Sequence, residues 1–268
     1  MQEIFEEFRP EIVFHAAAYK HVKLMQENPA EAIRKNAIAT RTVAELAGQH
    51  GVRRFVLVST DKAVSPKTTM GASKALAEWA IESAQARHED TTFCAVRFGN
   101  VLGSSGSVVP IFRRQIAAGG PVTVTHPEMS RYFMTIPEAV QLIIRAGDLG
   151  RGGEVFVLEM GEPVKIIDLA RNMITLAGLE PDVDIPIVVT APSPGEKLHE
   201  ELYNPDERPQ PTAAEKIVRA ESDNMDPARV DEIFDEVERL MINGRPQALA
   251  DLVQAAAGLT SESALPES

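Results

Sequence analysis

The chain has 268 residues and a formal net charge of −12, and 44% of its residues are hydrophobic. This length allows one large domain or two small ones, each with its own core. An acidic surface repels nucleic acid and anionic lipid, so neither is expected as a partner. The single cysteine, Cys94, excludes an internal disulfide framework and a cysteine-rich metal site.

Nothing in the sequence indicates export or insertion into a membrane. No apolar run approaches the length of a membrane span. Met1–Pro10 is acidic and amphipathic, whereas a signal peptide is basic and then apolar. The chain is therefore expected to have no membrane segment and to be cytoplasmic.

Apolar runs of strand length alternate with amphipathic stretches of helix length along most of the chain. Several runs are apolar nearly throughout, which is typical of parallel strands covered on both faces. Because alternating strands and helices are joined by right-handed crossovers, the predicted fold class is α/β with a doubly wound, Rossmann-like parallel sheet. In chain order the expected elements are a strand at Glu11–Ala18, a helix at Ala30–His50, a strand at Arg53–Thr60, a helix at Ala72–His88, a strand at Thr91–Val101, a helix at Val108–Ala118, a strand at Val122–Thr125, a helix at Pro137–Leu149, a strand at Glu154–Met160, a helix at Lys165–Ala177, a strand at Asp184–Thr190 and a helix at Pro227–Asn243.

The pattern predicts three parts of the chain. Residues 1–101 are expected to form a partial dinucleotide-binding domain. Residues 102–204 are expected to form a smaller substrate-binding region, interleaved with the last Rossmann elements at about 137–160. From Asn204 onward the chain is polar and rich in proline, so residues 205–268 are expected to form a helical extension with a frayed tail at Ser261–Ser268.

Ligands of doubly wound sheets bind at the carboxyl ends of the strands, so the residues after each strand are the candidates for function. The first strand ends in His15-Ala16-Ala17-Ala18. These alanines would let a flat ligand approach the backbone, but taken alone they are better explained by close packing of a helix on the strand.

The second predicted strand ends in Ser59-Thr60-Asp61-Lys62, which places a hydroxyl, a carboxylate and an amine together. A loop with an Asp cap and a solvated Lys is the alternative. Eight residues after Lys62, Met70-Gly71-Ala72-Ser73-Lys74 opens a helix. The i, i+4 spacing puts Met70 and Lys74 on one face of that helix.

A hydroxyl at a strand end followed by Tyr-x-x-x-Lys on the next helix is the pattern of the short-chain dehydrogenases/reductases. STDKA, a proline-containing loop and then xGA[ST]K resembles more particularly the nucleoside-diphosphate-sugar 4,6-dehydratases, the CapD-like group of polysaccharide biosynthesis that acts on UDP-N-acetylglucosamine. The resemblance extends in order through Phe14–Ala18, Arg97–Pro110, Gly120–Glu138, Gly152–Leu169 and Pro194–Glu201.

Two departures from the family pattern stand out. The Gly-rich turn that normally holds the dinucleotide is missing, and Met1–Pro10 resembles the helix before the family's fourth strand, so the sheet is expected to be N-terminally truncated. Position 70 is Met instead of Tyr, and a thioether cannot transfer a proton. Long, membrane-anchored members resemble this chain in having Met, so the full-length parent is expected to have an N-terminal membrane region.

The resemblance implies a reaction as well as a fold. The family oxidises the sugar at C4 with NAD or NADP, a base then removes the C5 proton, an acid expels the C6 hydroxyl as water, and hydride returns to C6. Because Met70 cannot transfer a proton, we assign the role of the base to Lys62 and the role of the acid to Asp61. Thr60 would hydrogen-bond the C4 oxygen. The expected cofactor contacts are Ala16, Ala17, Thr60 and Lys74, with Lys74 at the nicotinamide ribose.

The expected substrate is a UDP-sugar, and its contacts are assigned by the same resemblance. Lys20 and Asn100 are expected at the hexose and phosphate, and Arg131 at the diphosphate, because a guanidinium grips phosphate bidentately. Glu196 and Lys197 lie in a loop that resembles the nucleoside-binding loop. The alternatives are a surface Arg131 packed on its neighbour and an ordinary salt-bridged turn at Glu196. Asn36 is interpreted as a structural tie between a helix and the catalytic loop.

Two other functions remain open. A nucleotide-sugar epimerase shares the fold and the cofactor, but relies on the missing Tyr and does not need the Asp61-Lys62 pair. A non-catalytic fragment is the second alternative, because a sheet without its first strands exposes an edge and an apolar face. A homo-oligomer is expected, and no metal site is predicted.

Overall fold

The computed structural model describes residues 1–223 and 225–258; the expected tail at 261–268 lies outside them. The chain divides into two compact units. The first unit comprises Met1–Phe98, Val140–Glu159 and the described part of Glu201–Ser268. The second comprises Gly99–Ala139 and Met160–Glu200. Each unit is described on its own.

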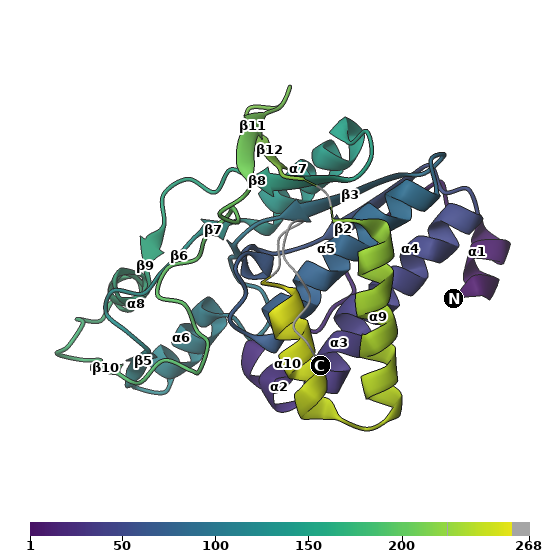
Figure 1. The fold of residues 1–268 in the computed structure, drawn as a ribbon. Helices are drawn as coiled ribbons and strands as arrows, with labels where there is room; N and C mark the ends of the chain where they lie inside the picture. The colour runs from purple at the N-terminus through teal and green to yellow at the C-terminus, as the bar shows by residue number, and fades with distance from the viewer. Residues whose placement is uncertain (224, 259–268) are drawn as a thin grey trace. The chain divides into compact units, whose positions relative to one another are not determined.

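The first unit is built on a six-stranded sheet with the strand order β1-β2-β3-β8-β12-β11. Strands β2, β3, β8, β12 and β11 are labelled in Figure 1. The first four strands are parallel neighbours, and β12 and β11 continue the sheet in antiparallel fashion. This confirms the Rossmann-like α/β fold, but the antiparallel strands were not predicted. The strands are β1 (Ile12–His15), β2 (Arg54–Val58), β3 (Thr92–Arg97), β8 (Glu154–Leu158), β11 (Arg208–Pro211) and β12 (Ile217–Glu221).

Helices cover both faces of this sheet because its central strands are apolar on both sides. Phe55 and Leu57 of β2 point to one face, where they share a core with helices α1, α4 and α5. Val56 points to the other face and lies against Gly147 of helix α7. The helices are α1 (Gln2–Phe8), α2 (Val22–Glu27), α3 (Pro29–Ile33), α4 (Ala39–Gln49), α5 (Thr69–Arg87) and α7 (Ile136–Leu149). A π-helical segment at Arg34–Ile38 joins α3 to α4, so the single helix expected at Ala30–His50 is three segments.

The helices of the C-terminal extension pack against the first unit. Helices α9 (Pro227–Ile242) and α10 (Pro246–Ala256) lie along the outer face of α5 (Figure 1). Phe234 and Val253 share a core there with Leu76 of α5. The sheet on one side and this helical pair on the other leave most of α5 buried.

One edge strand of the first unit's sheet is β1, which pairs with β2. Its residues Ile12 and Phe14 are 44% and 46% exposed, and Val140 and Ile144 of α7 are 48% and 54% exposed. The exposed edge and apolar surface expected from the sequence are therefore present in this unit.

The second unit packs two helices on small pairs of strands. Its core joins Phe112 of α6, Val124 of β5 and Ile174 of α8. Across the described residues of both units, no helix combines the length and apolar character needed to cross a membrane. The elements are β4 (Asn100–Val101), α6 (Val108–Ala117), β5 (Val122–Val124), β6 (Ser130–Arg131), β7 (Phe133–Met134), β9 (Val164–Lys165), α8 (Ile166–Leu176) and β10 (Ile187–Val189).

Candidate active site

A short turn follows the carboxyl end of β2. Thr60 caps a single 3-10 turn, Asp61–Ala63, by accepting a hydrogen bond from the backbone N–H of Lys62. The backbone N–H of Asp61 donates to the carbonyl of Phe98, which follows β3, at 3.1 Å. Residues 60–64, here called the Asp61 turn, are therefore fixed at the ligand-binding edge of the parallel strands.

Asp61 and Lys62 form a close pair within this turn. Oδ1 of Asp61 accepts hydrogen bonds from Oγ1 of Thr60 and from Nζ of Lys62, both at 2.9 Å. The Asp61 side chain is 1% exposed and that of Lys62 is 24% exposed. Oδ2 of Asp61 is buried and receives no hydrogen bond from the described residues. Because a buried carboxylate oxygen without a donor is costly, this atom is suited to a hydroxyl supplied by a ligand.

Helix α5 brings Met70 and Lys74 to the same buried side, at 3% and 5% exposure. Nζ of Lys74 donates to the carbonyl of Val58 at 2.9 Å, and burial lowers the pKa of its amine to about 8. Met70 packs with Met25 and Ala32 in an apolar cluster.

His15, at the end of β1, was not among the predicted site residues. Burial and the positive charge of Lys74 lower the pKa of its imidazole to about 4, so the ring is neutral near pH 7. Nε2 of His15 lies 3.0 Å from the hydroxyl of Thr40, which donates to the carbonyl of Asn36. Nε2 therefore carries the proton. A histidine before a run of alanines at a strand end was the available signal.

The backbone after β1 is held by Asn36, whose side-chain hydrogen bonds join it to α5. Its amide exchanges two hydrogen bonds with the backbone of Tyr19 and donates a third to the hydroxyl of Ser73 on α5. The neighbouring Ala16 and Ala17 are exposed, as is Lys20. Small exposed residues at this strand end leave the backbone accessible to a flat ligand.

Arg131 lies in the second unit and is 7% exposed, so it is not the surface residue that the alternative interpretation requires. Its guanidinium donates to the carbonyls of Lys197 and Leu198 at 2.9 and 3.1 Å. The carboxylates of Glu196 and Glu200 lie 3.6 and 3.7 Å away. In this structure Arg131 therefore fixes the loop at Glu196–Glu200.

The predicted site residues thus fall into two groups. Hydrogen bonds join Thr60, Asp61 and Lys62 in the first unit, which also holds Lys74, Ala16 and Lys20. Arg131, Glu196 and Lys197 are joined in the second unit. Asn100 is also in the second unit, where its backbone N–H donates to the carbonyl of Tyr132 at 3.0 Å.

The first unit fits one end of a dinucleotide and not the other. The buried amine of Lys74, the unpartnered Oδ2 of Asp61 and the exposed Ala16 and Ala17 offer polar and apolar contacts for a ring and its ribose. The sequence contains no G-x-G-x-x-G turn between a strand and a helix, which is the element that cradles the pyrophosphate.

Residues 1–222 match the model of the family described as "Polysaccharide biosynthesis protein". The chain belongs to this family. It is 54% identical over 235 residues to the capsular polysaccharide biosynthesis protein CapD of Staphylococcus aureus. The matched region covers 88% of this chain and 39% of CapD. The chain therefore spans about two fifths of the length of that relative.

Dehydratases and epimerases both occur among the similar proteins. A UDP-glucose 4-epimerase of Rickettsia canadensis is 44% identical over 147 residues, covering 54% of this chain and 43% of the epimerase. The solved structure of a double mutant of DesIV, a dTDP-glucose 4,6-dehydratase from Streptomyces venezuelae with NAD and DAU bound, has a TM-score of 0.67. At 20% identity, covering 75% of this chain and 68% of DesIV, it shows a shared fold.

Proposed function

We propose that this chain supplies the proton-transfer pair and the sugar-binding part of an NAD(P)-dependent 4,6-dehydratase. Its substrate would be a UDP-N-acetylhexosamine and its product a 4-keto-6-deoxy sugar for polysaccharide synthesis. The partly buried Asp61-Lys62 pair carries this proposal, because elimination of water needs an acid and a base that act on neighbouring carbons.

The pair accounts for the proton balance of the elimination. As a neutral amine, Lys62 takes the C5 proton, and as a carboxylic acid, Asp61 gives a proton to the leaving C6 hydroxyl. One C–H and one C–O bond break, a C5–C6 double bond forms and water leaves. The pair is then an ammonium and a carboxylate. Proton transfer across the 2.9 Å contact between Nζ and Oδ1 restores the starting forms without a third residue.

Other residues support the same chemistry. Thr60 is hydrogen-bonded to Asp61 and could polarise the C4 oxygen. The apolar packing of Met70 agrees with a site in which position 70 transfers no proton. Epimerases that oxidise and reduce C4 need neither an acid at C6 nor a base at C5, so the contact between Asp61 and Lys62 favours dehydration.

The cofactor would be NAD or NADP, held at its nicotinamide end by Ala16, Ala17, Thr60 and Lys74. When bound, it would supply the oxidation at C4 and the return of hydride to C6. The neutral His15 ring adds no charge beside the cofactor. A segment with the Gly-rich turn would have to pair with the exposed edge of β1 to complete this site.

The substrate contacts remain proposals of the same kind. The loop that Arg131 holds, with Glu196 and Lys197, would receive the nucleoside and diphosphate, and Lys20 and Asn100 the hexose and phosphate. Because Arg131 already donates to two carbonyls of the loop, its main effect on binding would come through the shape of the loop. The cytoplasmic location and the homo-oligomeric state also stay predictions.

The test is the identity of the product. The chain, fused behind a β-α-β segment with the Gly-rich turn from a relative, would be incubated with NAD+ and UDP-N-acetylglucosamine. A dehydratase gives a product lighter by one water with a keto group at C4, whereas a 4-epimerase gives an isomer of unchanged mass. A fused protein that binds both ligands and gives neither product would favour the non-catalytic alternative.

A further inference from the structure

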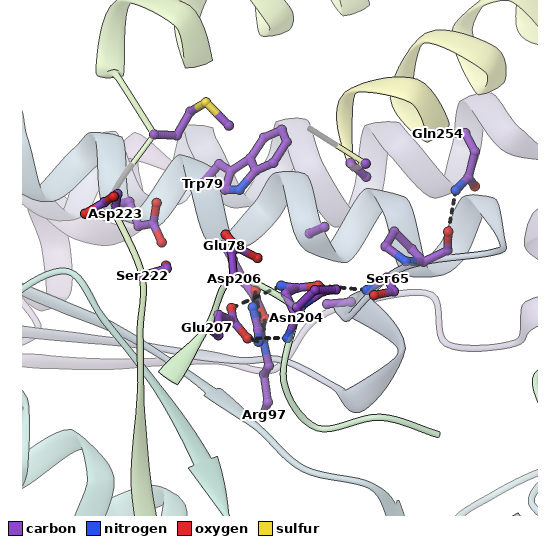
Figure 2. A pocket seen from close by; sticks show the side chains of 18 of the residues that line it. Ser65, Glu78, Trp79, Arg97, Asn204, Asp206, Glu207, Ser222, Asp223 and Gln254 are labelled. Carbon is purple, nitrogen blue, oxygen red and sulfur yellow. Dashed lines mark hydrogen bonds and ion pairs between the residues drawn. The ribbon is translucent and has the colours of Figure 1, made fainter. Parts of the chain in front are cut away.

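A buried network of charges lies beside the Asp61 turn and is centred on Arg97, at the end of β3 (Figure 2). The guanidinium lies between two carboxylates. Nε and Nη2 donate to Glu78 of α5 at 3.0 and 2.6 Å, and Nη1 donates to Glu207 at 2.7 Å. The three side chains are 3–6% exposed.

One arm of the network reaches the residue that precedes the Asp61 turn. The hydroxyl of Ser59 donates to Oε1 of Glu78 at 2.5 Å, and Ser59 is followed directly by Thr60. Glu78 is one helical turn after Lys74 on α5. The same carboxylate therefore joins the helix that presents Lys74 to the end of the strand that presents Thr60.

The other arm reaches the residue that follows the turn. Glu207 accepts hydrogen bonds from the backbone N–H and the side-chain amide of Asn204, at 2.6 and 3.0 Å. Oδ1 of Asn204 then accepts from the backbone N–H of Ser65 at 2.8 Å (Figure 2). Ser65 has a φ of 36°, in the left-handed region that a serine rarely adopts. The hydrogen bond that Ser65 donates to Asn204 thus holds a strained residue in place.

We propose that Glu78, Arg97, Asn204 and Glu207 are positioning residues that hold both ends of the Asp61 turn and so align Asp61 with Lys62. This inference rests on the proposed function. The inference extends that function to residues from three distant segments of the chain.

Because the network consists of buried charges, we expect it to align the Asp61 turn more than to stabilise the fold. Buried ion pairs often stabilise a fold no more than well-packed apolar side chains would, because each charge loses its hydration. Their directional hydrogen bonds do specify one geometry, and a reaction at two neighbouring carbons needs such geometry. The network also lines a cavity of about 470 Å³. Water in that cavity could solvate Arg97 in a variant that lacks one carboxylate, so such a variant should fold.

The test begins with amide hydrogen exchange in the 268-residue chain. Asn204→Ala removes the acceptor for Ser65, and Glu207→Gln removes a charge from Arg97. Each should raise exchange at Ala63 and Val64 by about tenfold or more, the scale set by losing a hydrogen bond to a charged group. Asp206→Asn is the matched control, since exposed Asp206 lines the same cavity. Unchanged exchange in the turn, or an equal rise throughout β2 and β3, would overturn the inference.

The second arm uses the enzyme completed with its dinucleotide-binding segment. Asn204→Ala should lower kcat by about tenfold to 10²-fold, as expected for a small misplacement of reacting groups, and leave KM nearly unchanged. Asp61→Asn separates the two proposals. If Asp61→Asn abolishes dehydration while Asn204→Ala keeps full kcat, only the positioning role of the network is wrong. If Asp61→Asn retains full turnover, the proposed function itself fails.

Discussion

Gly71, in the first turn of α5, lies directly against the carbonyl of Lys62. A Cβ atom added to Gly71 would overlap the Lys62 carbonyl oxygen and press on Pro66. The helix that presents Lys74 and the turn that presents Lys62 are therefore in contact through backbone atoms. Glycine is needed here because of this close approach, and not because of its backbone angles.

Gly71→Ala should therefore displace the Asp61 turn. Overpacking of this kind costs about 1–3 kcal/mol, so the melting temperature should fall by several degrees. Exchange at the amides of Asp61 and Ala63 should rise more than exchange in β3. A melting temperature equal to that of the original chain would show that the turn can shift freely, and would contradict a tightly fixed site.

Met70→Leu should leave both folding and turnover nearly unchanged. The substitution keeps the volume of a side chain that packs with Met25 and Ala32, and such exchanges usually cost less than about 1.5 kcal/mol. Turnover of the completed enzyme is the measurement. Loss of activity in a folded variant would mean that the thioether has a chemical role.

Glu82 should make the stability of the chain depend on pH. Burial, together with the nearby Glu78 carboxylate, raises the pKa of the Glu82 carboxyl from 4.5 to about 8. Between these values the folded chain retains a proton that the unfolded chain has lost. The contribution of the protonated Glu82 carboxyl to the free energy of unfolding therefore falls as pH rises. It is lost as the pH passes the pKa of the folded state.

Glu82→Gln removes this titration. The difference in free energy of unfolding, variant minus original chain, should be larger at pH 8 than at pH 5. Urea unfolding at the two pH values measures it, with Glu232→Gln, a change at an exposed residue of α9, as the control. A relative stability that is the same at both pH values would show that Glu82 keeps an ordinary pKa.

Dinucleotide should bind the isolated chain weakly or not at all, whereas UDP-N-acetylglucosamine should bind better. Pyrophosphate affinity in this fold comes from a Gly-rich turn and a helix N-terminus that this sequence lacks. Titration calorimetry with NAD+, NADP+ and the UDP-sugar is the measurement. Micromolar binding of a dinucleotide by this chain alone would reveal a cofactor site that differs from the family pattern.

Local patterns predicted much of this structure. The apolar run at Arg53–Thr60 contains β2, and the i, i+4 spacing placed Met70 and Lys74 on one buried face. The contact of Asp61 with Lys62 follows from their adjacency. Strand β11 could not be predicted, because its two prolines are tolerated at a sheet edge but do not indicate a strand.

The contacts that surround the site depend on tertiary structure. Asn204 lies 139 residues from Ser65, and the Arg97–Glu207 contact spans 110 residues. Neither spacing carries a periodicity that a single sequence reveals. Taken alone, Ser59–Lys62 favoured a loop with an Asp cap and a solvated Lys, and the catalytic interpretation came from the family resemblance. The burial of Asp61, which is 1% exposed, could not be predicted from these four residues.

Elimination of water by Asp61 and Lys62 can be tested directly. The most direct measurement is the rate at which the completed enzyme forms the 4-keto-6-deoxy product from UDP-N-acetylglucosamine, compared among the original protein, Asp61→Asn and Lys62→Ala. We expect each substitution to lower that rate by about 10²-fold or more, the scale of general acid–base catalysis, with the UDP-sugar still bound. A near-normal rate in either variant would contradict the account.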